Sequence, residues 1–126
     1  MNSVEIILYV SDQNASTKFY EKLLDKKPVL FVPGMTSFQI VENCRLGLMP
    51  SNSIAKILQN KTPHPDNGSG IPRCELYVYV DDIHQAYKRA IDCGASLISD
   101  IALRDWGDYA CYFADCDGHI IAFAKK

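Results

Sequence analysis

Alternating apolar and polar residues mark the first segment of the chain, and helical spacing marks the second. Residues 4–10 (VEIILYV) are rich in β-branched and aromatic side chains and predict a strand. Apolar side chains then recur at helical spacing at Ala15, Phe19, Leu23 and Leu24, and either Asp12 or Asn14 can cap the helix that they predict. The pattern predicts a strand followed by a helix that ends near residue 24.

Three further strands are expected near residues 29–32, 37–41 and 45–49. The turn formers Pro33-Gly34 and Glu42-Asn43 separate them. The first fifty residues therefore predict one βαβββ unit.

A connection follows at about residues 50–72. Ile54, Ile57 and Leu58 predict a short helical turn, and the sequence KTPHPDNGSGIP after it has the composition of a loop.

The pattern then restarts. Residues 74–82 (CELYVYVDD) align with residues 4–12 (VEIILYVSD), and the pairs Glu5/Glu75, Tyr9/Tyr79, Val10/Val80 and Asp12/Asp82 are identical. A helix at 82–93, closed by Gly94, and strands near 96–103, 108–114 and 119–124 complete a second βαβββ unit. The repeated order of elements indicates an internal duplication.

Composition excludes several classes of function. The chain has 126 residues, 48% of them hydrophobic, which suits one globular domain. Its net charge of −2 and its scattered Lys and Arg argue against a nucleic-acid partner. No apolar run is long enough to span a bilayer, and the N-terminal residues lack the features of a signal peptide. The odd number of cysteines, five, without a CxxC spacing, fits the cytoplasmic location that we expect.

Three segments carry a resemblance to a known superfamily: LYVSDQNASTKFYEKLL (8–24), YVDDIHQAYKRAIDCGA (79–95) and RDWGDYACYFADCDGHIIAFA (104–124). They resemble the glyoxalase/bleomycin-resistance/dioxygenase superfamily, also called the vicinal oxygen chelate superfamily. The resemblance implies an α+β fold in which two tandem βαβββ units, at about 3–50 and 73–125, form curved mixed sheets around a pocket. It also implies a single domain over residues 1–126 and a homodimer.

The resemblance bears on metal binding. Metal-dependent members take one ligand from the first strand of a unit and one from its fourth. The matching first-strand positions are Glu5 and Glu75, but the fourth-strand positions hold Gly47 and Ala122, which have no donor atom. We therefore expect no metal and no other cofactor. If a metal is bound, the expected ligands are Glu5 and Glu75, with His64 as a third donor.

Strand alternation places both glutamates and their neighbouring tyrosines on the face opposite the aliphatic side chains. We expect this face to bind a ligand, because the same placement occurs in both halves; the alternative is that the glutamates lie at an exposed edge or form a salt bridge at a subunit interface. Trp106 either stacks on a planar ligand or caps the core. The expected ligand contacts are Glu5, Tyr9, Phe38, Glu75, Tyr77, Trp106 and Tyr112.

Three functions remain open. The first is a metal-free protein that binds a planar or cationic, antibiotic-like small molecule, as the bleomycin-resistance resemblance implies. The second is a metal-dependent lyase, isomerase or dioxygenase of the glyoxalase type. The third is a protein with a degenerate pocket that acts only by interaction. The missing fourth-strand carboxylates favour the first, which is not an enzyme.

Overall fold

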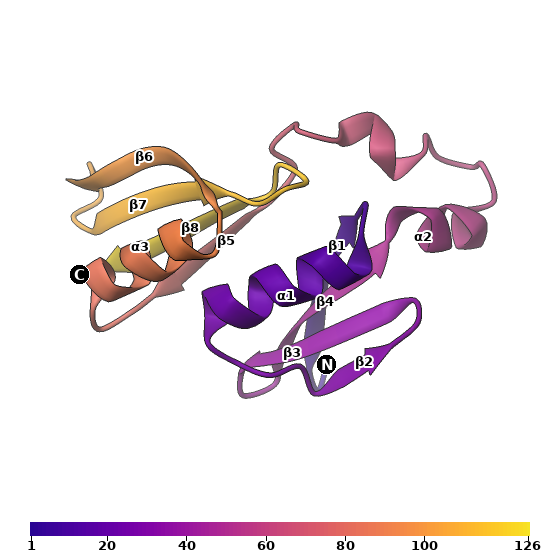
Figure 1. Cartoon of the computed structure of the whole chain (residues 1–126), viewed down its shortest axis with the longest axis horizontal. Coiled ribbons are helices and arrows are strands. Elements are labelled where there is room, and N and C mark those ends of the chain that lie inside the picture. The colour runs from indigo at the N-terminus through magenta and orange to yellow at the C-terminus, as the bar shows by residue number, and fades with distance from the viewer. The chain divides into compact units, whose positions relative to one another are not determined.

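Each half of the chain folds into a four-stranded mixed sheet with a helix packed on one face (Figure 1). The computed structural model describes residues 1–126, and the chain divides into two units, Met1–Ser69 and Gly70–Lys126. The predicted α+β fold of two tandem βαβββ units is confirmed.

The first unit contains seven elements. They are β1 (Val4–Val10), α1 (Gln13–Leu24), β2 (Leu30–Val32), β3 (Met35–Val41), β4 (Cys44–Pro50), α2 (Ser51–Leu58) and the 3-10 helix η1 (Pro65–Gly68). The strand order is β1-β4-β3-β2, with β1 parallel to β4 and the other neighbours antiparallel. The predicted connection between the units therefore holds two short helices.

The second unit repeats this arrangement. Its elements are β5 (Glu75–Tyr79), α3 (Ile83–Asp92), β6 (Ser96–Leu103), β7 (Tyr109–Ala114) and β8 (Ile120–Lys125). The strand order is β5-β8-β7-β6, and β5 is parallel to β8. In each unit, therefore, the first strand lies at one edge of the sheet and pairs with the fourth strand.

Identical residues cap the two main helices. The Asp12 carboxylate accepts a hydrogen bond from the Ala15 N–H, and the Asp82 carboxylate accepts one from the Gln85 N–H, both over 3.0 Å. Each bond satisfies one of the N–H groups that a helix leaves unpaired at its first turn. The repeated aspartate in the sequence therefore marks the start of each helix.

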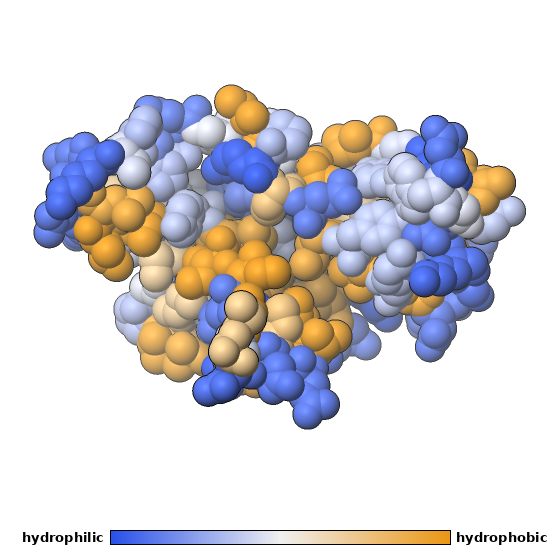
Figure 2. Space-filling model, turned by 180° about the vertical axis from the view of Figure 1, so that it is seen from behind, coloured by the Kyte–Doolittle hydropathy of each residue, from blue (hydrophilic) through white to orange (hydrophobic).

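The core of each unit lies between the sheet and its helix, where α1 packs on β3 and β4 and α3 packs on β7 and β8. The first sheet buries Leu8, Val10, Leu46 and Leu48, and the second buries Phe113, Ile121 and Phe123. Burial of these side chains supplies most of the driving force for folding. Apolar residues also remain on the surface, as the orange areas of Figure 2 show.

The buried face of α1 differs from the predicted one. Ala15 is exposed, and Ser16, Thr17, Tyr20 and Leu23 are buried. Two small hydroxyl residues can face the sheet because Thr17 finds a partner there: its Oγ1 lies 2.8 Å from Thr36 Oγ1 on β3. No helix of the chain combines the length and the apolar character that crossing a membrane requires.

Candidate functional site

Four side chains of the second unit, Tyr77, Tyr79, Trp106 and Asp108, form one hydrogen-bonded group, which we call the Tyr–Asp–Trp cluster. The hydroxyls of Tyr77 and Tyr79 both donate to Oδ2 of Asp108, over 2.9 and 2.8 Å. Trp106 Nε1 donates to the Tyr77 hydroxyl over 2.9 Å. The Tyr77 hydroxyl therefore accepts one hydrogen bond and donates another, which orients the indole and both phenols around a single carboxylate.

Small residues on the neighbouring strand make room for the two phenols. Tyr77 and Tyr79 alternate along β5 and so share a face, and they pair with Ala122 and Ala124 of β8. Both alanines are fully buried. The phenol rings meet edge to face, with centroids 5.4 Å apart. Ala122 therefore lies on the same face of the sheet as Tyr77 and Tyr79, and its small side chain leaves room for their rings.

A tight turn between β6 and β7 positions Asp108. The Arg104 N–H donates to the Asp108 carbonyl over 2.8 Å, and the Gly107 N–H donates to the Arg104 carbonyl over 2.9 Å. Gly107 has φ +98°, a conformation that glycine adopts without steric cost. Asp108 is only 5% exposed, whereas Trp106 in the same turn is 60% exposed. The turn therefore buries the carboxylate and leaves much of the indole open to solvent.

The cluster keeps its phenols protonated. Burial raises the pKa of Tyr77, and its hydrogen bond to Asp108 raises it further against the opposing effect of the Trp106 N–H. For Tyr79, the hydrogen bond to Asp108 is the main cause of a raised pKa, followed by burial. Deprotonation would remove the donated hydrogen bond and set two negative groups side by side. Both hydroxyls are therefore donors at neutral pH.

Tyr112 extends the aromatic face toward β7, where it pairs with Ala122. The Arg104 guanidinium lies 5.0 Å from the centre of the Tyr112 ring. Burial raises the pKa of Tyr112, and the negative charge of Glu75 adds to the rise. Glu75 itself is exposed at the start of β5. These residues lie beside the cluster, and none of their side chains is hydrogen-bonded to a side chain of the cluster.

In the first unit the equivalent face is filled by Glu5. Its Oε2 accepts a hydrogen bond from Ser37 Oγ over 2.6 Å. A Cβ atom at Gly47, on the strand between them, would lie 2.6 Å from that same Oε2 and 2.8 Å from Met35 Cε. Glu5 thus lies across the glycine, in the place that a longer side chain at position 47 would need.

The residues do not fit the divalent metal that the superfamily resemblance implies. A protein-held transition metal needs several donor side chains at coordination distance. Within the first unit the Glu5 carboxylate lies over Gly47, and within the second unit the strand next to Glu75 holds Ala122. Each unit therefore supplies one carboxylate where two donors are required, and Glu5 is already hydrogen-bonded to Ser37.

His64 does not complete such a site, because both of its ring nitrogens have partners close by. The Asp66 N–H donates to Nδ1 over 3.1 Å, and Nε2 lies 3.0 Å from Oδ1 of Asn52. The Asp66 bond caps the helix η1, so the imidazole has a local structural role. The expectation that His64 supplies a third metal donor has no support in this geometry.

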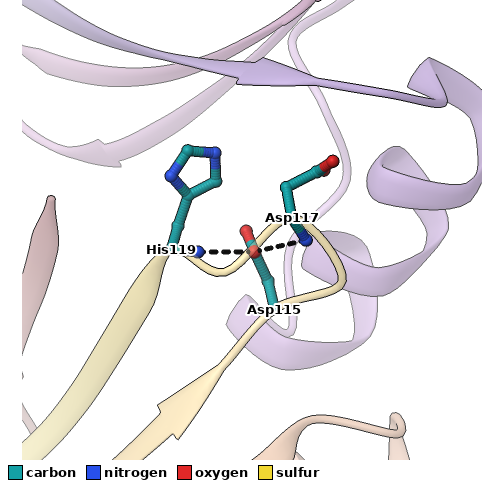
Figure 3. A group of neighbouring side chains, drawn as sticks. All are labelled: Asp115, Asp117 and His119. Carbon is teal, nitrogen blue, oxygen red and sulfur yellow. Dashed lines mark hydrogen bonds between the residues drawn. The ribbon is translucent and has the colours of Figure 1, made fainter. Parts of the chain in front are cut away.

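A second group of donor residues, Asp115, Asp117 and His119, lies in the turn between β7 and β8 (Figure 3). Asp115 Oδ1 accepts hydrogen bonds from the N–H groups of Asp117 and His119, both over 2.9 Å. His119 Nδ1 also lies 3.6 Å from Cys74 Sγ. These bonds build the turn itself, as expected of an aspartate at the start of a hairpin loop.

The structure brings together only part of the predicted ligand set. Tyr77 and Trp106 lie in the cluster, and Tyr112 lies beside it on the same sheet. Glu5 and the half-buried Tyr9 belong to the first unit, described separately. Phe38 does not support the prediction of a ligand contact: it pairs with the buried Leu46, is itself fully buried, and belongs to the core. Strand parity places its side chain on the helix side of the sheet.

Two members of the cluster are missing from the predicted set. Tyr79 lies on the expected face, because it alternates with Tyr77, and its identity with Tyr9 was a usable signal. Asp108 gave no signal, since an aspartate at the start of a strand is common in turns. Only the folded turn shows that its carboxylate meets two phenols from a strand about thirty residues earlier.

Comparison with known families decides the relationship. The family model of the glyoxalase-like domain matches residues 3–126. The chain belongs to this family. Within the vicinal oxygen chelate superfamily, the glyoxalase-like chain is 26% identical over 115 residues to the uncharacterized protein Mb0911c of Mycobacterium bovis, covering 89% of this chain and 75% of that protein.

Solved structures share the fold. A glyoxalase-related enzyme from Fulvimarina pelagi superposes with a TM-score of 0.82 at 21% identity, over 100% of this chain and 89% of that one. A glyoxalase/bleomycin resistance protein from Catenulispora acidiphila gives 0.69 at 18% identity, over 100% and 99%. A glyoxalase/bleomycin resistance protein/dioxygenase family enzyme from Burkholderia phytofirmans gives 0.75 at 18% identity, over 98% and 96%. At these identities the likeness establishes the fold of the glyoxalase-like chain.

Proposed function

We propose that this glyoxalase-like protein binds a small planar or cationic organic molecule without a metal ion, and that it is not an enzyme. The observation that carries the proposal is the Tyr–Asp–Trp cluster, which sets three aromatic side chains around one carboxylate. Exposed, oriented aromatic rings bind planar molecules by stacking.

The composition of the metal positions supports the same proposal. Gly47 and Ala122 offer no donor, and Glu5 occupies the space over Gly47. A site that has lost its chelating side chains and kept an aromatic face is suited to organic ligands.

Fluorescence of Trp106, the single tryptophan, tests the proposal directly. We expect planar intercalating antibiotics to quench or shift its emission in a saturable way. Trp106→Ala should weaken binding, measured by calorimetry, by about tenfold, the contribution of one stacked aromatic pair. Phe31→Ala is the matched control, because Phe31 is an exposed aromatic residue of the first unit, outside the cluster.

Metal analysis of protein purified without chelators separates this proposal from a metal-dependent lyase, isomerase or dioxygenase. We expect Zn, Ni, Mn and Fe below one tenth of an equivalent, roughly the level of loose surface binding. A stoichiometric metal that is lost in the Glu5→Gln variant would contradict the proposal. So would the absence of any fluorescence response across a broad panel of planar compounds.

A further inference from the structure

We propose that the cluster takes an organic ammonium group, with Asp108 as the residue that selects for positive charge. This inference rests on the proposed binding function and names the ligand chemistry that the second unit recognises. Asp108, Tyr77, Tyr79 and Trp106 provide the site.

Asp108 is a carboxylate without a cation. It is 5% exposed, and its only side-chain hydrogen bonds are the two from Tyr77 and Tyr79 to Oδ2. It forms no ion pair with another side chain of the protein. A carboxylate removed from water is normally matched by a positive charge or by a full set of hydrogen bonds. Asp108 has neither.

The second carboxylate oxygen, Oδ1, remains available. No fully buried side-chain nitrogen or oxygen of the chain lacks a hydrogen-bond partner. Oδ1 accepts no hydrogen bond and must therefore keep contact with solvent. In the proposed complex the ammonium group would approach the carboxylate from the side of this atom, while Oδ2 stays bonded to the phenols.

The walls around Asp108 also suit a cation. The faces of tyrosine and tryptophan rings attract positive charge, and several rings around an ammonium group form the usual recognition site for alkylated amines. Trp106 and Tyr77 have centroids 6.4 Å apart, and Tyr77 and Tyr79 are 5.4 Å apart. Aromatic walls offer nothing to a hydrated metal ion, which needs oxygen ligands. The chemistry of the site is therefore that of an organic cation.

One ammonium group of the chain already uses this surface. Nζ of Lys126 lies 5.3 Å from the centre of the Tyr79 ring. Tyr79 is nonetheless 55% exposed, so the ring keeps a large free surface. This primary ammonium lies over the Tyr79 ring, where it would compete with a bound ligand.

The nearest arginine is committed elsewhere. Arg104 Nη2 donates to the carbonyls of Asp100 and Ala110, both over 2.8 Å, and to Ser99 Oγ over 3.0 Å. Its guanidinium is therefore held on the backbone of β6 and β7, and it forms no salt bridge with Asp108. The negative charge of Asp108 is left for a ligand.

The test compares choline with its neutral carbon analogue, in which a tert-butyl group replaces the trimethylammonium group. The readouts are Trp106 fluorescence and calorimetry on the full chain. We expect choline to bind at least about tenfold more tightly than the analogue, the range of a desolvated cation–aromatic contact with a carboxylate. This comparison uses the unmodified protein and does not depend on how a variant folds.

Asp108→Asn should abolish the difference between the two compounds, because the amide oxygen can still accept from the phenols but the charge is gone. Asp105→Asn is the matched control: Asp105 is exposed in the same turn and makes no hydrogen bond. It should keep the preference for choline. Lys126→Met should tighten choline binding by about threefold, since it removes a competitor worth roughly one exposed cation–aromatic contact.

Equal binding of choline and its neutral analogue, or an unchanged preference for choline in Asp108→Asn, would overturn the cation site. If neutral planar compounds still bind under those conditions, the proposed function stands and only this inference fails. If neither ammonium compounds nor planar compounds bind, both fail.

Discussion

The Glu5 side chain occupies the space above Gly47 on the neighbouring strand. The superfamily resemblance implies a metal donor at both positions, whereas here the glutamate extends over the glycine and accepts a hydrogen bond from Ser37. The bond gives the carboxylate a partner on its own sheet. Substitutions of Glu5 and Gly47 should therefore have coupled effects on stability, and the effect of one depends on the residue at the other position.

We predict that Gly47→Ala lowers the free energy of unfolding by about 1 kcal/mol, because the added methyl displaces Glu5 and Met35. The contacted atoms are the ends of flexible side chains, so the protein should still fold. In a Glu5→Ala background the cost should shrink, which a double-mutant cycle measured by urea denaturation can detect. Equal costs in both backgrounds would show that Glu5 does not lie over the glycine.

The raised pKa values of Tyr77 and Tyr79 predict a loss of stability at high pH. The folded protein holds these two protons more tightly than the unfolded chain, in which a tyrosine has a pKa of about 10. The stabilising contribution is therefore complete below about pH 10 and is lost as the pH rises through the folded-state values. Denaturation curves between about pH 8 and pH 11 measure the effect.

The double variant Tyr77→Phe, Tyr79→Phe should be less stable at neutral pH by about 1–3 kcal/mol, because Asp108 loses both donors. It should also lose less on going to high pH than the unmodified protein. Tyr109→Phe, at an exposed tyrosine without a hydrogen bond, is the control and should leave the pH dependence unchanged. Identical pH profiles for the double variant and the unmodified protein would contradict the role assigned to the cluster.

At the scale of elements, turns do much of the positioning. The β7–β8 turn is held by Asp115, and Gly118 within it touches the chain as it enters the second unit: a Cβ at Gly118 would lie 2.7 Å from the backbone of Gly70. The Gly70 N–H also donates to the Asp117 carbonyl over 3.0 Å. This contact sets the path of the chain into β5, which carries Tyr77 and Tyr79.

A comparison of Gly94 with Gly118 separates the energetic cost of backbone strain from the cost of a steric clash. Gly94 and Gly118 have nearly the same φ, +89° and +90°, but a Cβ at Gly94 meets nothing within 4 Å. Gly94→Ala should cost about 1–2 kcal/mol, the strain of a left-handed residue. Gly118→Ala should cost more by about 1–3 kcal/mol, because a rigid backbone blocks the methyl group. Equal losses in thermal denaturation would mean that the Gly70 contact is not maintained in solution.

At the scale of the whole molecule, the two units have the same topology, and each satisfies the hydrogen bonds of its buried polar side chains. Every fully buried side-chain nitrogen or oxygen has a hydrogen-bond partner. Leaving such a group unpaired costs about 1–3 kcal/mol, so the units are internally consistent in their polar as well as their apolar packing. The proposed function is assigned to the sheet face of the second unit that carries Tyr77 and Tyr79.

We predict that the protein is a homodimer in solution, as the superfamily resemblance implies. Sedimentation velocity should give a particle of twice the chain mass that persists on dilution to about micromolar concentration, the range expected of a specific interface. A particle of single-chain mass throughout the concentration series would contradict this prediction.

The sequence by itself determined the architecture. The repeat of residues 4–12 at 74–82, the helical spacing and the positions of proline and glycine were enough for two βαβββ units, because local propensity and periodicity act within a few residues. The missing donors at Gly47 and Ala122 were equally readable. The buried face of α1 was predicted only in part: Leu23 is buried as expected, but Ala15 is exposed and Thr17 is buried, with its hydroxyl 2.8 Å from that of Thr36 on β3.

Only the tertiary structure decided which residues form the candidate site. Phe38 belongs to the core and Asp108 to the cluster, and no local pattern distinguishes these outcomes. Which face a strand buries depends on the helix that covers it, and which phenols a carboxylate meets depends on how a distant turn folds back onto the sheet. Hydrogen bonds between residues about thirty positions apart are products of the folded chain, and the chemistry of this site consists of such bonds.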